Sequence, residues 1–302
     1  MPFSVAKYFR MRRTDPPTHF PPIAYVLIAV FIWSTGGVLI KLTSLDAYQV
    51  TFFRSLLAAV TVLAITYRKS GIKIDLFGIA TSIIYALLLF LFVWATKKTT
   101  AANAIFLQYT APIYILILGP FVIGEQFHFR DLLAVVFCIG GMSLFFVGQL
   151  QIDDYQGNIA ALFSGVFLGL YILFLRHPRA QRLNPAVAVI YGNLLLAALT
   201  LPSGISALAT ISLSDVFYVS FLGIIQIGIA YLLFIKGVRG GTRPLDASLI
   251  GFIEPLLNPV WVYIFYHERP SEWAILGGAV IIATVAVHAI MGEKGKRLIF
   301  AE

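Results

Sequence analysis

Two residues of opposite charge lie inside long apolar runs of this sequence. Glu254 lies about nine residues into the run that begins at Leu245, and Arg54 lies within the run that begins at Ala47. If these runs cross a membrane, a charge near the centre costs roughly 2.5–3.5 kcal/mol, so it faces a cavity, has a partner or is neutralised by a proton. Glu254 is therefore a candidate to contact a ligand or carry a proton. A structural hydrogen bond to a neighbouring helix is the alternative.

Arg54 is the first partner to consider for Glu254. At 1.5 Å per residue, Arg54 lies ~10 Å and Glu254 ~18 Å below the same membrane surface if both runs are straight helices. Two long side chains can span that difference in depth if the helices are adjacent. We therefore expect either a charge pair or two groups that bracket the charges of a zwitterionic ligand. Snorkelling of Arg54 to the headgroups is the alternative.

Other polar side chains inside apolar runs are candidates for ligand contact or gating. They are Gln108, Tyr109, Asn258, Gln226, Tyr85 and Asn193. Trp33 and Tyr231 belong to the wider set of intramembrane aromatic residues, whereas Trp94 and Trp273 lie near the ends of runs and are expected to be interface anchors.

Two segments of the sequence are similar at a constant offset of 143 residues: Ala101–Gln126 and Leu245–Arg269. The identities are Ala104 with Ala247, Pro112 with Pro255, and Glu125 with Glu268. Along one helical stripe, the first copy has Gln108 and Ala111 where the second has Gly251 and Glu254. We interpret the pair as a duplication, and expect an asymmetric site where the copies differ.

The prolines and glutamates of these copies suggest mechanical roles. Pro112, Pro255 and Pro259 each remove a backbone donor and are predicted to kink or open their helices, so they are hinge candidates. Glu125 and Glu268 are expected to cap helix ends, with paired gates as the alternative.

The composition indicates a membrane protein. Of the 302 residues, 59% are hydrophobic and only 12% are charged, against about 25% in soluble domains. The net charge of +8 raises the possibility of nucleic-acid binding, but the charges lie between apolar runs as in membrane proteins, so no nucleic-acid partner is expected. The partner that the composition predicts is the lipid bilayer.

Ten apolar runs approach the twenty residues that a membrane-spanning helix needs. They are Ile23–Leu42, Ala47–Tyr67, Leu76–Thr96, Ala101–Ile123, Leu132–Gly148, Gly157–Leu175, Pro185–Leu201, Val216–Ile235, Leu245–Tyr266 and Trp273–Ile290. Lipid leaves no backbone group unpaired, so these runs are predicted to be helices. Residues 1–22 form a basic tail without a signal-peptide cleavage site, and residues 292–302 a second tail.

The basic residues predict the orientation. Seventeen of the 22 lysines and arginines flank one side of the ten runs and four flank the other. Because positive charge favours the cytoplasm, both termini are predicted to be cytoplasmic, in the inner or plasma membrane.

The duplication then predicts inversion. The similar runs are the fourth and the ninth, so each half has five spans, and an odd number turns the second copy upside down. The predicted fold is an all-α membrane protein with two inverted five-helix repeats, residues 23–148 and 155–291. Secondary transporters commonly use this plan, with the substrate near the midplane where the repeats meet.

The sequence resembles the drug/metabolite transporter superfamily, in its EamA-like branch. The resemblance rests on WSTGGVLIK, TFFRSLLAA and the Ala…Pro…Glu pattern of runs four and nine. The family pattern maps onto Trp33, Lys41, Arg54, Pro112, Glu125, Glu254, Pro255 and Glu268. It implies alternating access and export of small organic metabolites such as amino acids.

Other functions receive less support. The sequence has no His-Glu-x-x-His or Gly-x-Ser-x-Gly motif and one cysteine, Cys138, so we expect no enzyme, catalytic residue, metal or cofactor. The alternatives to an exporter are an importer or exchanger of another metabolite or drug and, with less support, a channel or lipid scramblase. No oligomeric state is predicted.

Overall fold

The computed structural model describes residues 20–66, 72–145, 147, 154–266 and 271–299, and every regular element among them is a helix. The predicted all-α class is therefore confirmed for these residues. The helices are α2 Pro22–Trp33, α3 Gly36–Leu42, α4 Ala47–Thr66, α5 Leu76–Lys98, α6 Ala101–Gln108, α7 Ala111–Val122, α8 Phe129–Phe145, α9 Tyr155–Arg176, η1 Ala180–Arg182, α10 Val187–Leu199, α11 Leu201–Ala207, α12 Leu213–Ser220, η2 Phe221–Ile229, α13 Ala230–Arg239, α14 Pro244–Gly251, α15 Ile253–Tyr266 and α16 Glu272–Ile299.

Seven segments of the described chain are long and apolar enough to cross a membrane. They are Pro22–Leu42, Ala47–Thr66, Leu76–Lys98, Asn103–Val122, Tyr155–Arg176, Leu213–Arg239 and Glu272–Met291. The pair α10 and α11 makes an eighth if it is counted as one span. The two remaining predicted runs, Leu132–Gly148 and Leu245–Tyr266, overlap α8 and the pair α14–α15.

Several runs predicted as single helices are interrupted. The first divides into α2 and α3, the fourth into α6 and α7, and the ninth into α14 and α15, while α10 and α11 meet at a bend of 65°. Pro112 lies in the first turn of α7 and Pro255 in the first turn of α15, where the missing proline donor removes no helical hydrogen bond. The interruptions near Pro112 and Pro255 agree with the opening predicted from these prolines, whereas the breaks between α2 and α3 and between α10 and α11 were not predicted.

The breaks in α6–α7 and α14–α15 occupy equivalent positions. Helix α6 ends at Gln108 and α14 at Gly251, which is the offset of 143 residues that relates the two copies in sequence. Local opening near Pro112 and Pro255, as the sequence predicts, is thus a feature of both halves.

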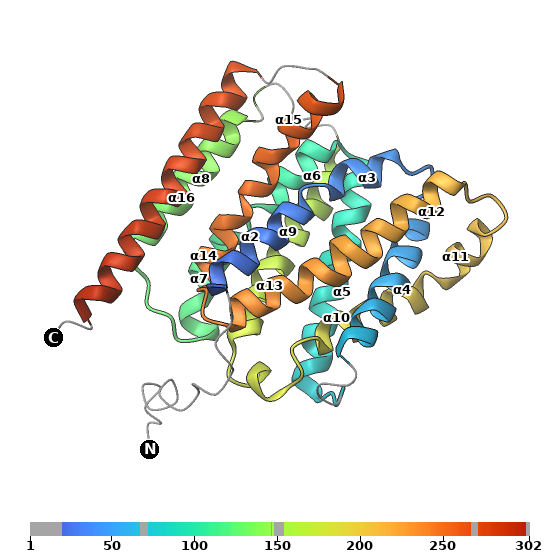
Figure 1. The fold of residues 1–302 in the computed structure, drawn as a ribbon, viewed down its shortest axis with the longest axis horizontal. Coiled ribbons are helices and arrows are strands. Elements are labelled where there is room, and N and C mark those ends of the chain that lie inside the picture. The colour runs from blue at the N-terminus through green and yellow to red at the C-terminus, as the bar shows by residue number, and fades with distance from the viewer. Residues whose placement is uncertain (1–19, 67–71, 146, 148–153, 267–270, 300–302) are drawn as a thin grey trace.

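The helix contacts made by the first half of the chain have counterparts in the contacts made by the second half (Figure 1). Helix α5 packs along α9, and its counterpart α13 packs along α2. In the same way, the contact of α4 with η2 corresponds to that of α10 with α5. Helices α6 and α7 contact α9, as α14 and α15 contact α2. Helix α8 packs mainly on α16, and this pair lies at one edge of the bundle. The other helices surround the buried core.

Candidate functional site

A cavity of about 40 Å³ lies among helices from both halves of the chain. It is lined by Trp33, Arg54, Leu88, Leu89, Phe92, Gln108, Tyr109, Leu168, Gln226, Ile227, Tyr231 and Glu254. Five of the eight binding or gating candidates named from the sequence therefore line one cavity, which we call the central cavity.

Glu254 joins the two halves across the central cavity. Its Oε2 accepts a hydrogen bond of 2.7 Å from the hydroxyl of Tyr109, which follows the last residue of α6. The Tyr109 ring packs on Phe252, with ring centroids 5.3 Å apart, and a Cβ at Gly251 would lie 2.7 Å from that ring. Glycine at 251 thus leaves room for the ring that directs its hydroxyl to Glu254.

Arg54 is buried, with 1% of its surface exposed, so it does not snorkel to the surface. No ion pair joins it to Glu254, and its Nη2 donates to the Leu89 carbonyl oxygen at 3.4 Å. The predicted charge pair is wrong, because the helices place the two side chains at separate parts of the cavity wall. Helix η2 comes close to α4 here, since a Cβ at Gly223 would lie 2.8 Å from the Arg54 carbonyl oxygen.

Gln108 and Gln226 line the cavity in different ways. Gln108 Nε2 donates to Ser164 Oγ at 2.7 Å, and Ser164 Oγ in turn donates to the Leu88 carbonyl oxygen at 3.0 Å. Gln226 lies on the π-helix η2, and its amide is packed against Gly36 at the start of α3. π-Helical turns are rare and frequently lie at functional sites.

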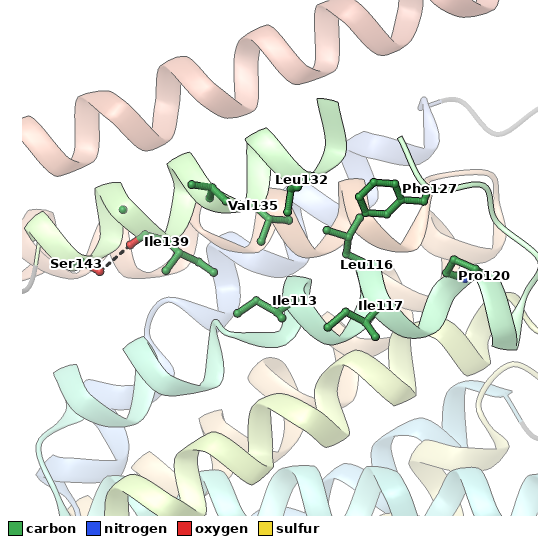
Figure 2. A pocket seen from close by; sticks show the side chains of 11 residues that line it. Ile113, Leu116, Ile117, Pro120, Phe127, Leu132, Val135, Ile139 and Ser143 are labelled. Carbon is green, nitrogen blue, oxygen red and sulfur yellow. Dashed lines mark hydrogen bonds between the residues drawn. The ribbon is translucent and has the colours of Figure 1, made fainter. Parts of the chain in front are cut away.

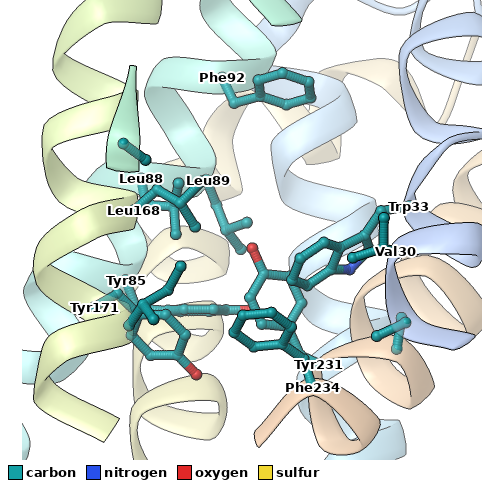
Figure 3. Packing of buried hydrophobic residues seen from close by; sticks show 14 of the residues in the cluster. Val30, Trp33, Tyr85, Leu88, Leu89, Phe92, Leu168, Tyr171, Tyr231 and Phe234 are labelled. Atoms are coloured by element: carbon teal, nitrogen blue, oxygen red, sulfur yellow. The ribbon is translucent and has the colours of Figure 1, made fainter. Parts of the chain in front are cut away.

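Trp33 and Tyr231 are cavity residues that sequence reasoning placed only in a wider set of aromatic candidates. Their rings pack with centroids 4.7 Å apart, and Trp33 also packs on Phe234 at 4.8 Å (Figure 3). The signal for them was an aromatic ring inside an apolar run, which membrane helices also place toward lipid.

The other sequence candidates lie away from the cavity lining or outside the description. Tyr85 is not part of the lining, and its ring packs on Tyr231 with centroids 5.0 Å apart (Figure 3). Asn193 Nδ2 donates to the Val189 carbonyl oxygen at 2.8 Å and to the Tyr85 hydroxyl at 3.4 Å. The side chains of Asn258 and Pro259, and all of Glu268, lie outside the described residues.

A larger groove between α7 and α8 offers different chemistry. Its volume is about 700 Å³, and Figure 2 shows mainly aliphatic side chains such as Ile113, Leu116 and Ile139 along it. Its lining contains no ionisable residue, and Ser143 Oγ donates to the Ile139 carbonyl oxygen at 2.9 Å. The central cavity, which holds a cation and a carboxylate, is therefore the candidate site.

Neither cavity resembles a metal centre. Within the part of the chain that the structure describes, no group of three or more His, Cys, Asp or Glu residues is arranged to hold a metal ion.

A model of the EamA-like transporter family matches the chain twice, over residues 20–147 and 155–289. The chain belongs to this family. The resemblance predicted from the sequence is thereby confirmed, and each match covers one of the halves that exchange in the packing.

Relatives of this EamA-family chain include transporters from distant organisms. It is 23% identical over 264 residues to an uncharacterized transporter of Archaeoglobus fulgidus, covering 87% of this chain and 94% of the relative. It is 24% identical to the uncharacterized transporter YxxF of Bacillus subtilis, covering 92% of each. It is 21% identical to human solute carrier family 35 member G1, covering 88% of this chain and 78% of the relative.

The fold is also found in a solved crystal structure, described only as that of a protein. The two agree with a TM-score of 0.73 at 18% identity, over 89% of this chain and 97% of the other. At this identity the likeness concerns the fold alone.

Proposed function

We propose that this EamA-family transporter is a secondary active carrier that exports small organic metabolites, with amino acids as the leading class. The observation that carries the proposal is the central cavity between the two halves, whose wall includes buried Arg54 and, at a separate place, buried Glu254. A buried charge without a counter-ion is costly, which favours a role in binding a polar solute over a role in packing.

The proposed architecture is ten spans in two inverted repeats, residues 23–148 and 155–291. The exchange of halves in the packing and the equivalent helix breaks support it. With both termini in the cytoplasm, the short connection before α14 is cytoplasmic and the one before α12 faces outward. The membrane is the inner or plasma membrane.

The proposed mechanism is alternating access with hinges at Pro112 and Pro255, and with Pro259 as a third candidate. A water molecule needs about 10–15 Å³ by the measure used for such cavities, so 40 Å³ holds only a few waters. A metabolite therefore enters only when the helices move apart. The interrupted segments α6–α7 and α14–α15 are suited to such a movement, because the regular helical hydrogen bonding already stops at their breaks.

Counterflow in liposomes tests the proposal. Purified protein is reconstituted in vesicles loaded with an unlabelled amino acid mixture, and uptake of labelled amino acid is followed. Saturable uptake that depends on internal solute supports a carrier, whereas flux that does not saturate with concentration indicates a channel or scramblase.

Two conservative variants test the assigned site in the same assay. Arg54→Lys removes the guanidinium geometry and Glu254→Gln removes the carboxylate charge. Wild-type counterflow in both variants would exclude the central cavity as the solute site.

A further inference from the structure

Two helices of the first half exchange basic side chains at their C-terminal ends. Lys41, in the last turn of α3, donates from Nζ to the Thr99 carbonyl oxygen at 2.7 Å, just after α5. Lys97, in the last turn of α5, donates from Nζ to the Thr43 carbonyl oxygen at 2.9 Å, just after α3. Carbonyl groups at the end of a helix lack partners within that helix, so each lysine satisfies the end of the other helix. The two hydrogen bonds tie the first span of this half to the third.

The second half repeats this exchange with arginines. Arg176, the last residue of α9, donates from Nη1 to the Val238 carbonyl oxygen at 3.4 Å, in the last turn of α13. Arg239, the last residue of α13, donates from Nη2 to the Ala180 carbonyl oxygen at 3.0 Å and from Nη1 to the Leu183 carbonyl oxygen at 3.3 Å, beyond the end of α9. The tie between first and third spans is therefore a feature of both halves rather than the cap of one helix.

Each tied loop lies against the first turn of the third span of the other half. The loop after α3, residues 43–46, contacts Asp215 in α12: Thr43 Oγ1 donates to its carboxylate at 2.7 Å and the Ser44 amide N at 2.8 Å. The loop after α9, residues 177–186, contacts the start of α5, where the His177 ring stacks on Phe77 with centroids 4.8 Å apart. Because one loop is tied to the end of α5 and the other touches its start, the two loops lie at opposite ends of the bundle.

The two contacts differ in chemistry at one equivalent position. Asp215 and Gly78 are the third residues of α12 and α5. The Asp215 carboxylate accepts hydrogen bonds from the loop after α3, whereas a Cβ at Gly78 would lie 3.1 Å from Leu183 Cδ1 in the loop after α9. Glycine thus permits close apolar packing at the position where the other half uses a charge.

We propose that Lys97 and Arg239 are positioning residues of two gates, one at each end of the bundle. Lys97 holds the loop after α3 against Asp215, and Arg239 holds the loop after α9 against the first turn of α5. A carrier of this plan opens one end while the other stays closed, and a loop that is tied to its own half moves with that half. Both contacts are formed in this structure, in agreement with a central cavity of only about 40 Å³.

This assignment rests on the proposed transport function and names the gates of that function. With the orientation proposed above, the gate at Asp215 faces outward and the gate at Phe77 faces the cytoplasm. A solute outside the cell reaches the central cavity after the loop after α3 leaves α12, and a solute in the cytoplasm after the loop after α9 leaves α5.

Labelling from each side of the membrane tests the assignment. Cys138 is the only cysteine of the sequence, so Cys138→Ser gives a background without thiols, and Phe92→Cys places a reporter in the lining of the central cavity. A membrane-impermeant maleimide is applied to right-side-out and to inside-out vesicles. We expect Lys97→Gln to raise the labelling rate about tenfold from the outside only, and Arg239→Gln about tenfold from the cytoplasmic side only, because the loss of a hydrogen bond from a charged donor has an effect of that order.

Matched variants separate gating from a general loss of stability. Lys97→Arg and Arg239→Lys keep a charged donor and are expected to restore most of the wild-type labelling. Lys98→Gln and Arg182→Gln each remove an exposed charge close to a positioning residue and are expected to label as the wild type does. Labelling of Lys97→Gln that rises equally from both sides would show a loosened fold and overturn the assignment, as would labelling unchanged from the wild type.

Counterflow in the same vesicles distinguishes this assignment from the transport proposal. Side-specific labelling together with flux that does not saturate would uphold the gates and contradict the carrier. Saturable counterflow with labelling that neither glutamine variant changes would uphold the carrier and overturn the gates.

Discussion

The two ends of the helix bundle are both closed by polar contacts between the halves, but these contacts differ in kind. At one end, which we call the Arg243 end, the arginine before α14 meets carboxylates from the first half. At the other, the Asp215 end, a carboxylate in the first turn of α12 meets neutral donors from the loop before α4.

At the Arg243 end, a single arginine of the second half makes the hydrogen bonds to the carboxylates of the first half. Arg243 Nε donates to Glu125 Oε1 at 2.5 Å and Arg243 Nη2 to Asp131 Oδ2 at 2.8 Å, while His288 Nε2 lies 3.1 Å from Asp246 Oδ1. Burial lowers the pKa of the Arg243 guanidinium, but the hydrogen bonds to Asp131 and Glu125 outweigh it and raise that pKa above the usual value. Glu125 thus forms an ion pair between the halves, rather than the helix cap expected from the sequence.

At the Asp215 end, several neutral donors share the contact with one carboxylate. Asp215 accepts from Thr43 Oγ1 at 2.7 Å, from Ser44 N and Ser44 Oγ at 2.8 Å each, and from Ser212 Oγ at 2.5 Å. Lys97 Nζ donates to the Thr43 carbonyl oxygen at 2.9 Å and so fixes the same loop.

This comparison indicates that a contact between the halves loses more stability on a single substitution when fewer groups form it. Asp131 is 1% exposed, and Arg243 is the cation closest to it, whereas Asp215 keeps several donors after any one is lost. Four substitutions of decreasing expected effect test this difference.

Arg243→Gln is expected to be the most destabilising change at either end. It removes the guanidinium that hydrogen-bonds to the buried Asp131 carboxylate and leaves Arg130, whose Nε lies 3.7 Å from Asp131 Oδ1, as the remaining arginine beside it. We expect the free energy of unfolding to fall by about 3 kcal/mol, because removing one partner of a buried ion pair costs about 3–5 kcal/mol. Unfolding in mixed detergent micelles measures it. Arg182→Gln, at an exposed arginine of η1, is the control, and its free energy of unfolding should change little. An equal loss in this control would contradict the role assigned to Arg243.

Asp215→Asn is expected to cost about 2 kcal/mol, since hydrogen bonds to a charged group contribute about 1.5–3 kcal/mol. The NH2 group of the asparagine would also face the hydroxyl groups of Thr43 or Ser44, which act as donors to Asp215. The same unfolding assay measures the change, with Glu272→Gln, an exposed residue of α16, as the control. A loss larger than that of Arg243→Gln would reverse the order of the two ends.

Thr43→Val is expected to cost about 1 kcal/mol, the usual contribution of one hydrogen bond. Valine keeps the shape of threonine, and the remaining donors continue to satisfy Asp215. Thr43→Ser keeps the hydroxyl and should lose less. If Thr43→Val cost as much as Asp215→Asn, the Asp215 end would depend on one donor after all.

The double variant Arg243→Gln/Asp215→Asn sharpens the comparison further. Because the two networks share no residue, the two losses should add to within about 0.5 kcal/mol. Arg243→Gln/Asp131→Asn is the contrasting pair and should lose less than the sum of its single variants, since the second change removes the charge that the first left unpaired. A strong coupling between the two ends would show that the ends do not respond independently.

The sequence by itself determined the helical class, the two similar halves and five polar residues of the cavity lining. Apolar runs of about twenty residues are helices in lipid for reasons of backbone hydrogen bonding, which are local. Arg54, Gln108, Tyr109, Gln226 and Glu254 were identifiable because polar groups inside such runs are costly unless they face one another or a solute.

Only the tertiary structure decided which of these groups meet. The membrane depths of Arg54 and Glu254 were predicted from the sequence as similar enough for a charge pair. The rotation and spacing of the packed helices instead place the two side chains apart, and Glu254 accepts its hydrogen bond from Tyr109. The same packing brings Trp33 and Tyr231 to the cavity and sets the 65° bend after α10. These features depend on contacts between residues far apart in the chain, and no local pattern of residues encodes them.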